Sequence, residues 1–115
     1  MYLLAFNNEP LTKIGITEDL ASRVDALNGH FDLRESYLVT ATDRRHARLL
    51  ERNLHTLFLG QRASASDPLT SGNTEIFRAE VLPIALEFIG RFRDLIPNAD
   101  YRVQKGVSDE TYPER

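Results

Sequence analysis

Apolar and polar residues alternate in blocks near the start of the chain. Segments 2–6 and 11–17 are both rich in bulky apolar residues, and the polar cluster 7–10 separates them. Asparagine accepts a left-handed φ and Pro10 cannot donate to a strand ladder, so this cluster predicts a turn. A third segment, 34–42, alternates loosely between apolar and polar residues. These patterns predict three short strands.

Helical spacing of apolar residues marks three further segments. Thr17 precedes the first as a helix cap, and Glu18 and Asp19 place negative charge in its first turn. Asp43 is a good N-cap for the second segment. Pro83 falls in the first turn of the third, where a missing N–H costs little. The predicted helices cover about residues 18–29, 44–58 and 80–95.

The order of these elements predicts the fold class. Strand, strand, helix, strand, helix, helix indicates an α+β domain (an α/β sandwich), with a small three-stranded antiparallel sheet flanked by about three helices. We expect this domain to span residues 1–96. Residues 60–74 are rich in small and polar residues and predict an exposed loop, followed by a brief ordered element at 75–78. From Pro97 the sequence turns polar and loses periodicity, so residues 97–115 predict a flexible tail.

Composition limits the class of protein. The 115 residues are 42% hydrophobic and 27% charged, which is ordinary for one soluble globular domain. The chain has no cysteine, so disulfides and thiolate metal sites are excluded, and we expect a cytoplasmic protein. No apolar run is long enough to span a membrane, and no signal peptide is expected at its start.

Charge is distributed unevenly. The net charge of −3 opposes general attraction to nucleic acid, but segment 41–63 holds five arginines against two acids, a local net charge of +3. Phosphate binding depends on the basic groups at the contact surface. Arg44, Arg48 and Arg52 are therefore candidate nucleic-acid-binding residues on the second predicted helix. An ordinary solvated helix face is the alternative interpretation of the same arginines.

Short motifs occur along the chain in a recognisable order. They are Met1–Leu3, Lys13–Gly15 with Thr17, Arg23 eight residues beyond Gly15, Glu51 with His55, and Thr74–Phe77. In this order the chain resembles the GIY-YIG nuclease superfamily over roughly residues 1–95, and most closely its compact phage-type branch, whose second motif reads Lys-Ile-Gly. The leading glycine of the family is missing, and its late asparagine has only Asn53 and Asn73 as candidates.

The resemblance implies a role for each matched residue. It implies that Tyr2 helps to activate the attacking water, that Arg23 stabilises the phosphate and that Glu51 binds the metal ion. Carboxylate oxygens also suit a hard divalent cation, so the expected cofactor is Mg²⁺ or Mn²⁺. Lys13 stands in the place of the family's second tyrosine, where it supplies positive charge but no phenol.

Other residues are candidates for supporting positions. His55 follows Glu51 by one helical turn, lies on the same face and is a candidate catalytic residue. Gly15 weakens a strand unless something approaches its backbone closely. Thr17 belongs to the second motif, and Glu75 is either a structural contact or a second carboxylate near the cleft. His30 and His46 have no partner pattern and are expected at the surface.

Two functions fit the sequence. The first is a metal-dependent endonuclease that hydrolyses phosphodiester bonds in DNA and belongs to a phage or other mobile element. The second is a GIY-YIG-like module with weak or lapsed catalysis, which binds DNA or a protein partner. Both exclude a membrane partner, and both leave a homodimer open.

Overall fold

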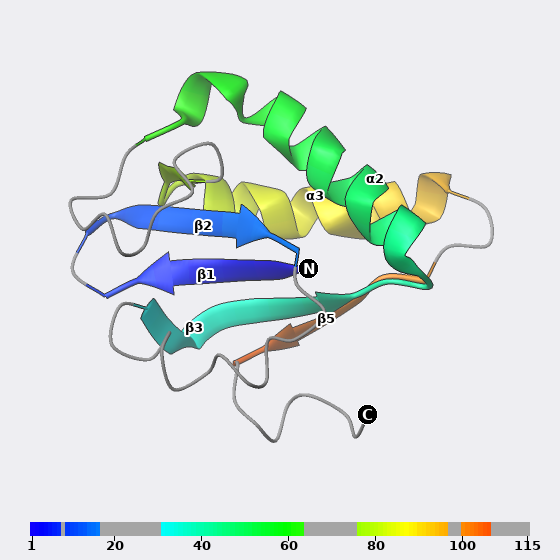
Figure 1. Ribbon diagram of the computed structural model, residues 1–115, viewed down its shortest axis with the longest axis horizontal. Helices are drawn as coiled ribbons and strands as arrows, with labels where there is room; N and C mark the ends of the chain where they lie inside the picture. The colour runs from blue at the N-terminus through cyan, green and yellow to red at the C-terminus, as the bar shows by residue number, and fades with distance from the viewer. Residues whose placement is uncertain (8, 17–30, 64–75, 97–99, 107–115) are drawn as a thin grey trace.

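Antiparallel strand pairing organises the chain. The computed structural model describes residues 1–7, 9–16, 31–63, 76–96 and 100–106. The elements are β1 (Tyr2–Phe6), β2 (Leu11–Gly15), β3 (Phe31–Thr40), α2 (Arg44–Leu57), the short 3-10 helix η2 (Leu59–Gln61), β4 (Ile76–Arg78), α3 (Val81–Leu95) and β5 (Arg102–Lys105). The five strands form one sheet in the order β4-β2-β1-β3-β5, so the N-terminal strand lies at its centre (Figure 1).

The register between β1 and β2 decides which side chains share a face of the sheet. Tyr2 lies opposite Gly15, Leu3 opposite Ile14, and Leu4 opposite Lys13. Paired residues point to the same face and neighbours along a strand point to opposite faces. Leu3 and Ile14 therefore face one side, and the pairs on either side of them face the other.

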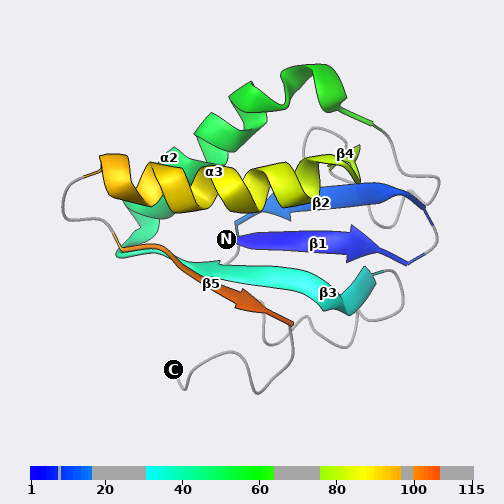
Figure 2. The same ribbon diagram turned by 180° about the vertical axis from the view of Figure 1, so that it is seen from behind.

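Each face of the sheet carries a cluster of buried apolar side chains. Helices α2 and α3 cover the first face and supply Leu50, Leu54, Ala85 and Ile89 to the cluster that contains Leu3. Figures 1 and 2 show the two helices from opposite sides of the sheet. The cluster on the second face holds Tyr2, Leu4, Phe6, Leu11, Phe31, Leu33, Leu38 and Ile76.

Helix α2 starts and ends where the sequence predicts. The carboxylate of Asp43 caps it by accepting a hydrogen bond from the backbone N–H of His46 at 2.9 Å. This hydrogen bond is the main cause that lowers the pKa of the Asp43 carboxyl. Helix α3 carries Pro83 in its first turn, as predicted. Both helices lie within two residues of their expected ranges.

The expected three-stranded sheet is wrong, because the sheet has five strands. Strand β4 arises from the brief ordered element, which pairs with β2. Strand β5 arises from the segment that was expected to be a flexible tail, and it pairs with β3 from Tyr37↔Lys105 to Thr40↔Arg102. All four residues of β5 are exposed, so this edge strand has none of the apolar alternation by which strands are recognised.

The expectation of about three flanking helices also needs correction. The described residues contain two α-helices, α2 and α3. The first expected helix, about 18–29, and most of the expected loop, 64–75, lie outside the described residues. Strand β3 begins at Phe31, three residues earlier than predicted. In the described part of the chain, no helix is long and apolar enough to cross a membrane.

Substitution of Thr12 tests whether its buried hydroxyl lowers the free energy of unfolding. It is 1% exposed, and its Oγ1 has no hydrogen-bond partner among the described residues. A buried polar group without a partner costs about 1–3 kcal/mol, so Thr12→Val should raise the free energy of unfolding by roughly 1 kcal/mol. Urea unfolding measures this change. Thr12→Ser, which keeps the hydroxyl and loses the methyl group, should destabilise, and a destabilised Thr12→Val would show that the hydroxyl is satisfied.

Substitution of Tyr101, the residue before β5, tests whether this segment belongs to the cooperatively folded core. Its ring is fully buried, and its hydroxyl donates to the backbone oxygen of His46 at 2.8 Å. Tyr101→Phe removes this hydrogen bond and should cost about 1 kcal/mol. Tyr101→Ala also removes the packed ring and should cost about 3–5 kcal/mol. If thermal or urea unfolding shows both variants as stable as the parent, the segment does not contribute to the core.

Candidate functional site

Glu51 and His55 form a pair near the middle of α2. Their side chains are both about one-fifth exposed, and His55 Nε2 lies 3.9 Å from Glu51 Oε2. His55 Nε2 also lies 3.4 Å from the backbone oxygen of Ile14, and its ring is tilted against Phe77 at a centroid distance of 5.4 Å. These contacts hold the pair over the end of β2. The spacing of one helical turn predicts that Glu51 and His55 share a face of α2.

Glu51 is also close to the start of β1. The amino group of Met1 donates to the backbone oxygen of Val39 at 2.8 Å. Burial lowers the pKa of this amino group to about 6, and the negative charge of Glu51 acts in the opposite direction and raises it. The contacts of His55 with Ile14 and of Glu51 with Met1 thus place the pair at the end of the sheet where β1 begins and β2 ends. Figure 1 marks this end of β1 with the N-terminus.

Tyr2 reaches the same end of the sheet from the other face. It is the first residue of β1, is 7% exposed and lies opposite Gly15, the last residue of β2. Lys13, two residues before Gly15, shares this face and is half-buried. Tyr2, Lys13 and Gly15 are therefore neighbours, while Glu51 and His55 lie on a helix that covers the opposite face.

Several predicted site residues lie outside the described residues. They are Thr17, Arg23, Asn73 and Glu75. Asn53 is described, and its side-chain amide donates to the backbone oxygen of Leu49 at 2.8 Å. This hydrogen bond lies within α2 and ties Asn53 to its own helix.

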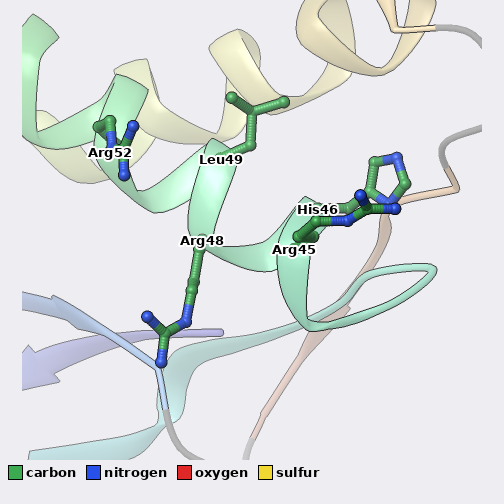
Figure 3. A pocket seen from close by; sticks show the side chains of 5 residues that line it. All are labelled: Arg45, His46, Arg48, Leu49 and Arg52. Atoms are coloured by element: carbon green, nitrogen blue, oxygen red, sulfur yellow. The ribbon is translucent and has the colours of Figure 1, made fainter.

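The exposed face of α2 carries the predicted arginines. Arg44, Arg48 and Arg52 are all exposed. Arg48 and Arg52, with three residues that the sequence interpretation did not select as site residues, line a shallow hollow of about 340 Å³. These lining residues are Arg45, His46 and Leu49, and Figure 3 shows them around the first turns of the helix. The spacing of Arg45, Arg48 and Arg52 by three and four residues is the sequence signal that could have identified this face.

His46 has a structural partner. Its Nδ1 lies 2.8 Å from Asp43 Oδ1, and its ring lies edge-on to Tyr101. The expectation that His46 has no partner pattern is therefore wrong, because the cap of α2 and the ring of Tyr101 hold it. His30 lies outside the described residues.

Glu51 is the candidate carboxylate for the expected divalent cation. Among the described residues, no three His, Cys, Asp or Glu side chains are grouped closely enough to hold an ion together. Mg²⁺, however, keeps several waters and often binds through one or two carboxylates together with substrate phosphates. Glu51 is partly exposed and meets that requirement.

The comparisons with known proteins give one match. The family model of the T5orf172 domain matches residues 1–94, a range that includes β1 to β4 and almost all of α3. Neither the curated proteins nor the solved structures give a match.

The pKa of the Met1 amino group tests the position of Glu51 without measuring activity. Glu51 raises this pKa against the effect of burial, so Glu51→Gln should lower it below the value of about 6. An NMR titration of protein with a labelled Met1 and a free amino group measures the change. Glu87→Gln is the matched control, because Glu87 is an exposed acid paired with Arg91 on α3. Equal pKa values in all three proteins would place Glu51 away from Met1.

Proposed function

Because the chain belongs to the T5orf172 domain family, a phage-associated domain of homing-endonuclease-like proteins, we propose that it is an endonuclease that hydrolyses phosphodiester bonds in DNA. The family is nuclease-associated, and this coarser assignment is compatible with a DNA endonuclease. The GIY-YIG type, the phage origin of this chain and the dependence on Mg²⁺ or Mn²⁺ are part of the proposal.

One observation carries the proposal. A half-buried carboxylate, Glu51, and an imidazole, His55, lie 3.9 Å apart at the end of the two N-terminal strands that hold the Tyr2 and Lys-Ile-Gly motifs. Glu51 borders the buried apolar stripe of α2 and is partly withdrawn from water, unlike a fully solvated surface charge. It is suited to hold a cation at a fixed place.

Glu51 also interacts with the amino group of Met1, whose pKa is lowered to about 6, mainly by burial. A bound Mg²⁺ or Mn²⁺ supplies charge stabilisation for the reacting phosphate and lowers the pKa of a bound water.

The other residues take the roles that the GIY-YIG resemblance implies. In this proposal Tyr2 helps to activate the water, Arg23 stabilises the phosphate, and His55 orients water or phosphate near Glu51. Lys13 contributes positive charge beside Tyr2, because the two residues share a face of the sheet. Gly15 lies opposite Tyr2 on the neighbouring strand. In this proposal glycine is needed there because a larger side chain would restrict the access of water or phosphate to the Tyr2 phenol.

A second candidate function is a module that binds DNA or a protein partner without efficient cleavage. The specific observation in its favour is the position of Tyr2, which is buried in the cluster on the face opposite α2. A phenol that activates water must be reached by that water. The replacement of the second tyrosine by Lys13 favours the same function.

Nicking of supercoiled plasmid distinguishes the two functions. With Mg²⁺ or Mn²⁺ we expect the parent protein to nick, and Glu51→Ala to nick at least about 100-fold more slowly, since a catalytic metal ion contributes several kcal/mol and each 1.36 kcal/mol is tenfold in rate. The matched control is Glu87→Ala, which removes an exposed, ion-paired acid from α3 and should nick like the parent.

The outcomes are separable. Nicking that persists in Glu51→Ala identifies a contaminating nuclease or a different site. If the parent does not nick with either metal but retards DNA, the binding module is the better description.

A further inference from the structure

Three arginines surround one leucine on the outer face of α2. Arg45, Arg48 and Arg52 line the hollow of about 340 Å³ together with Leu49 and His46. Successive arginines are three and four residues apart, so all three project from one face of the helix. We call this set of three arginines with Leu49 the arginine face. Its apolar floor comes from Leu49, which is 37% exposed.

The arginine face makes no salt bridge within the described part of the chain, and the negative charge of Asp43 interacts electrostatically with Arg45. No salt bridge there involves Arg45, Arg48 or Arg52. Asp43, the acid nearest to Arg45 in sequence, is hydrogen-bonded to His46 instead. Two other exposed arginines have acidic partners: Arg91 lies 3.0 Å from Glu87, and Arg102 lies 3.0 Å from Asp100.

One charge of the arginine face, Arg45, lies in the first turn of α2, which directly follows the Asp43 cap. Two arginines occupy the first turn of α2, and that turn contains no acid. The N-terminus of a helix carries a partial positive charge, so cations there are repelled and anions are attracted. A bound anion removes this repulsion, whereas solvent only screens it.

We propose that the arginine face binds the phosphate backbone of duplex DNA. The seven helical steps from Arg45 to Arg52 rise by about 10 Å along the helix axis, which suits two or three phosphates of one strand. The residues lining the hollow include no Phe, Tyr or Trp, the side chains on which single-stranded bases stack. The lack of these side chains favours a duplex over a single strand, and the positive charges of the arginines suit its phosphates.

Arg48 links this surface to the candidate site. It lies three residues before Glu51, so it is a neighbour of both the arginine face and the Glu51–His55 pair. Figure 3 shows its side chain extending away from Leu49 and Arg52. A DNA strand bound to the arginine face would run along α2 toward Glu51. The inference deepens the proposed function and rests on it, because the polyanion is taken to be the DNA that the site would cut.

The salt dependence of DNA binding tests the proposal independently of cleavage. All proteins carry Glu51→Gln and are kept in EDTA, and the probe is a fluorescent duplex of about two helical turns. We expect Arg45→Ala/Arg52→Ala to reduce the slope of log K against log salt by about 1.8, because each lost phosphate contact removes about 0.9. Affinity should fall at least about tenfold at low salt, and equally for unrelated sequences.

Two further variants make the test specific. Arg91→Ala/Arg102→Ala removes the same net charge from exposed positions on α3 and β5, and it should keep the parental slope. Arg45→Lys/Arg52→Lys keeps the charge and should keep most of the slope. Circular dichroism melting confirms that each variant is folded.

The result that overturns the proposal is a parental slope in Arg45→Ala/Arg52→Ala, or an equal loss in Arg91→Ala/Arg102→Ala. Tighter binding of a single strand than of the duplex also overturns it, as does an absence of any duplex binding at low salt. If the slope changes as expected but plasmid is never nicked, the arginine face stands and the hydrolase proposal fails. If nicking depends on Glu51 but not on these arginines, the reverse holds.

Discussion

The register between β1 and β2 is the constraint on which the rest of the structure depends. It places Tyr2 opposite Gly15 and Leu3 opposite Ile14. Because side chains alternate along a strand, this one alignment sends Leu3 and Ile14 toward α2 and α3 and sends Tyr2 and Lys13 to the opposite face. A slip of β2 by one residue would turn Ile14 away from α2 and α3 and would turn the charged Lys13 toward them. Because β1 is the central strand, the alignment of its neighbours on both sides is set relative to it.

Helix α2 serves both the core and the surface because its faces differ. Leu50 and Leu54 are fully buried against the sheet, the half-buried Glu51 and His55 border them, and the arginine face points to solvent. Packing fixes the rotation of the helix, and that rotation fixes where the acid and the arginines lie. The electrostatic properties of α2 are therefore a consequence of its apolar stripe.

The sequence predicted the elements that carry strong local signals. Asp43 as a cap, the apolar spacing of α2 and α3, and the turn before β2 each reflect chemistry within a few residues. Strand β5 could not be found in this way, since its four exposed residues gain order from pairing with β3 and from the buried ring of Tyr101. The closeness of Glu51 and His55 followed from helical spacing, whereas the separation of Tyr2 onto the opposite face required the sheet register. Arg45 was not predicted as a site residue, although it lies three residues before Arg48 and so on the same face of α2.

A single hydroxyl has a large effect on the alignment of β3. Ser36 is fully buried where the β1–β3 register shifts, accepts a hydrogen bond from Ala5 N at 2.9 Å and donates to Asp32 O at 2.8 Å. Leu3 pairs with Tyr37 and Ala5 with Asp32, so β3 advances five residues where β1 advances two, and the bulge holds three extra residues beside this hydroxyl. A side chain without a hydroxyl at position 36 would make neither hydrogen bond. The point where the alignment changes would then lose both bonds that mark it, immediately before the four residues of β3 that pair with β5.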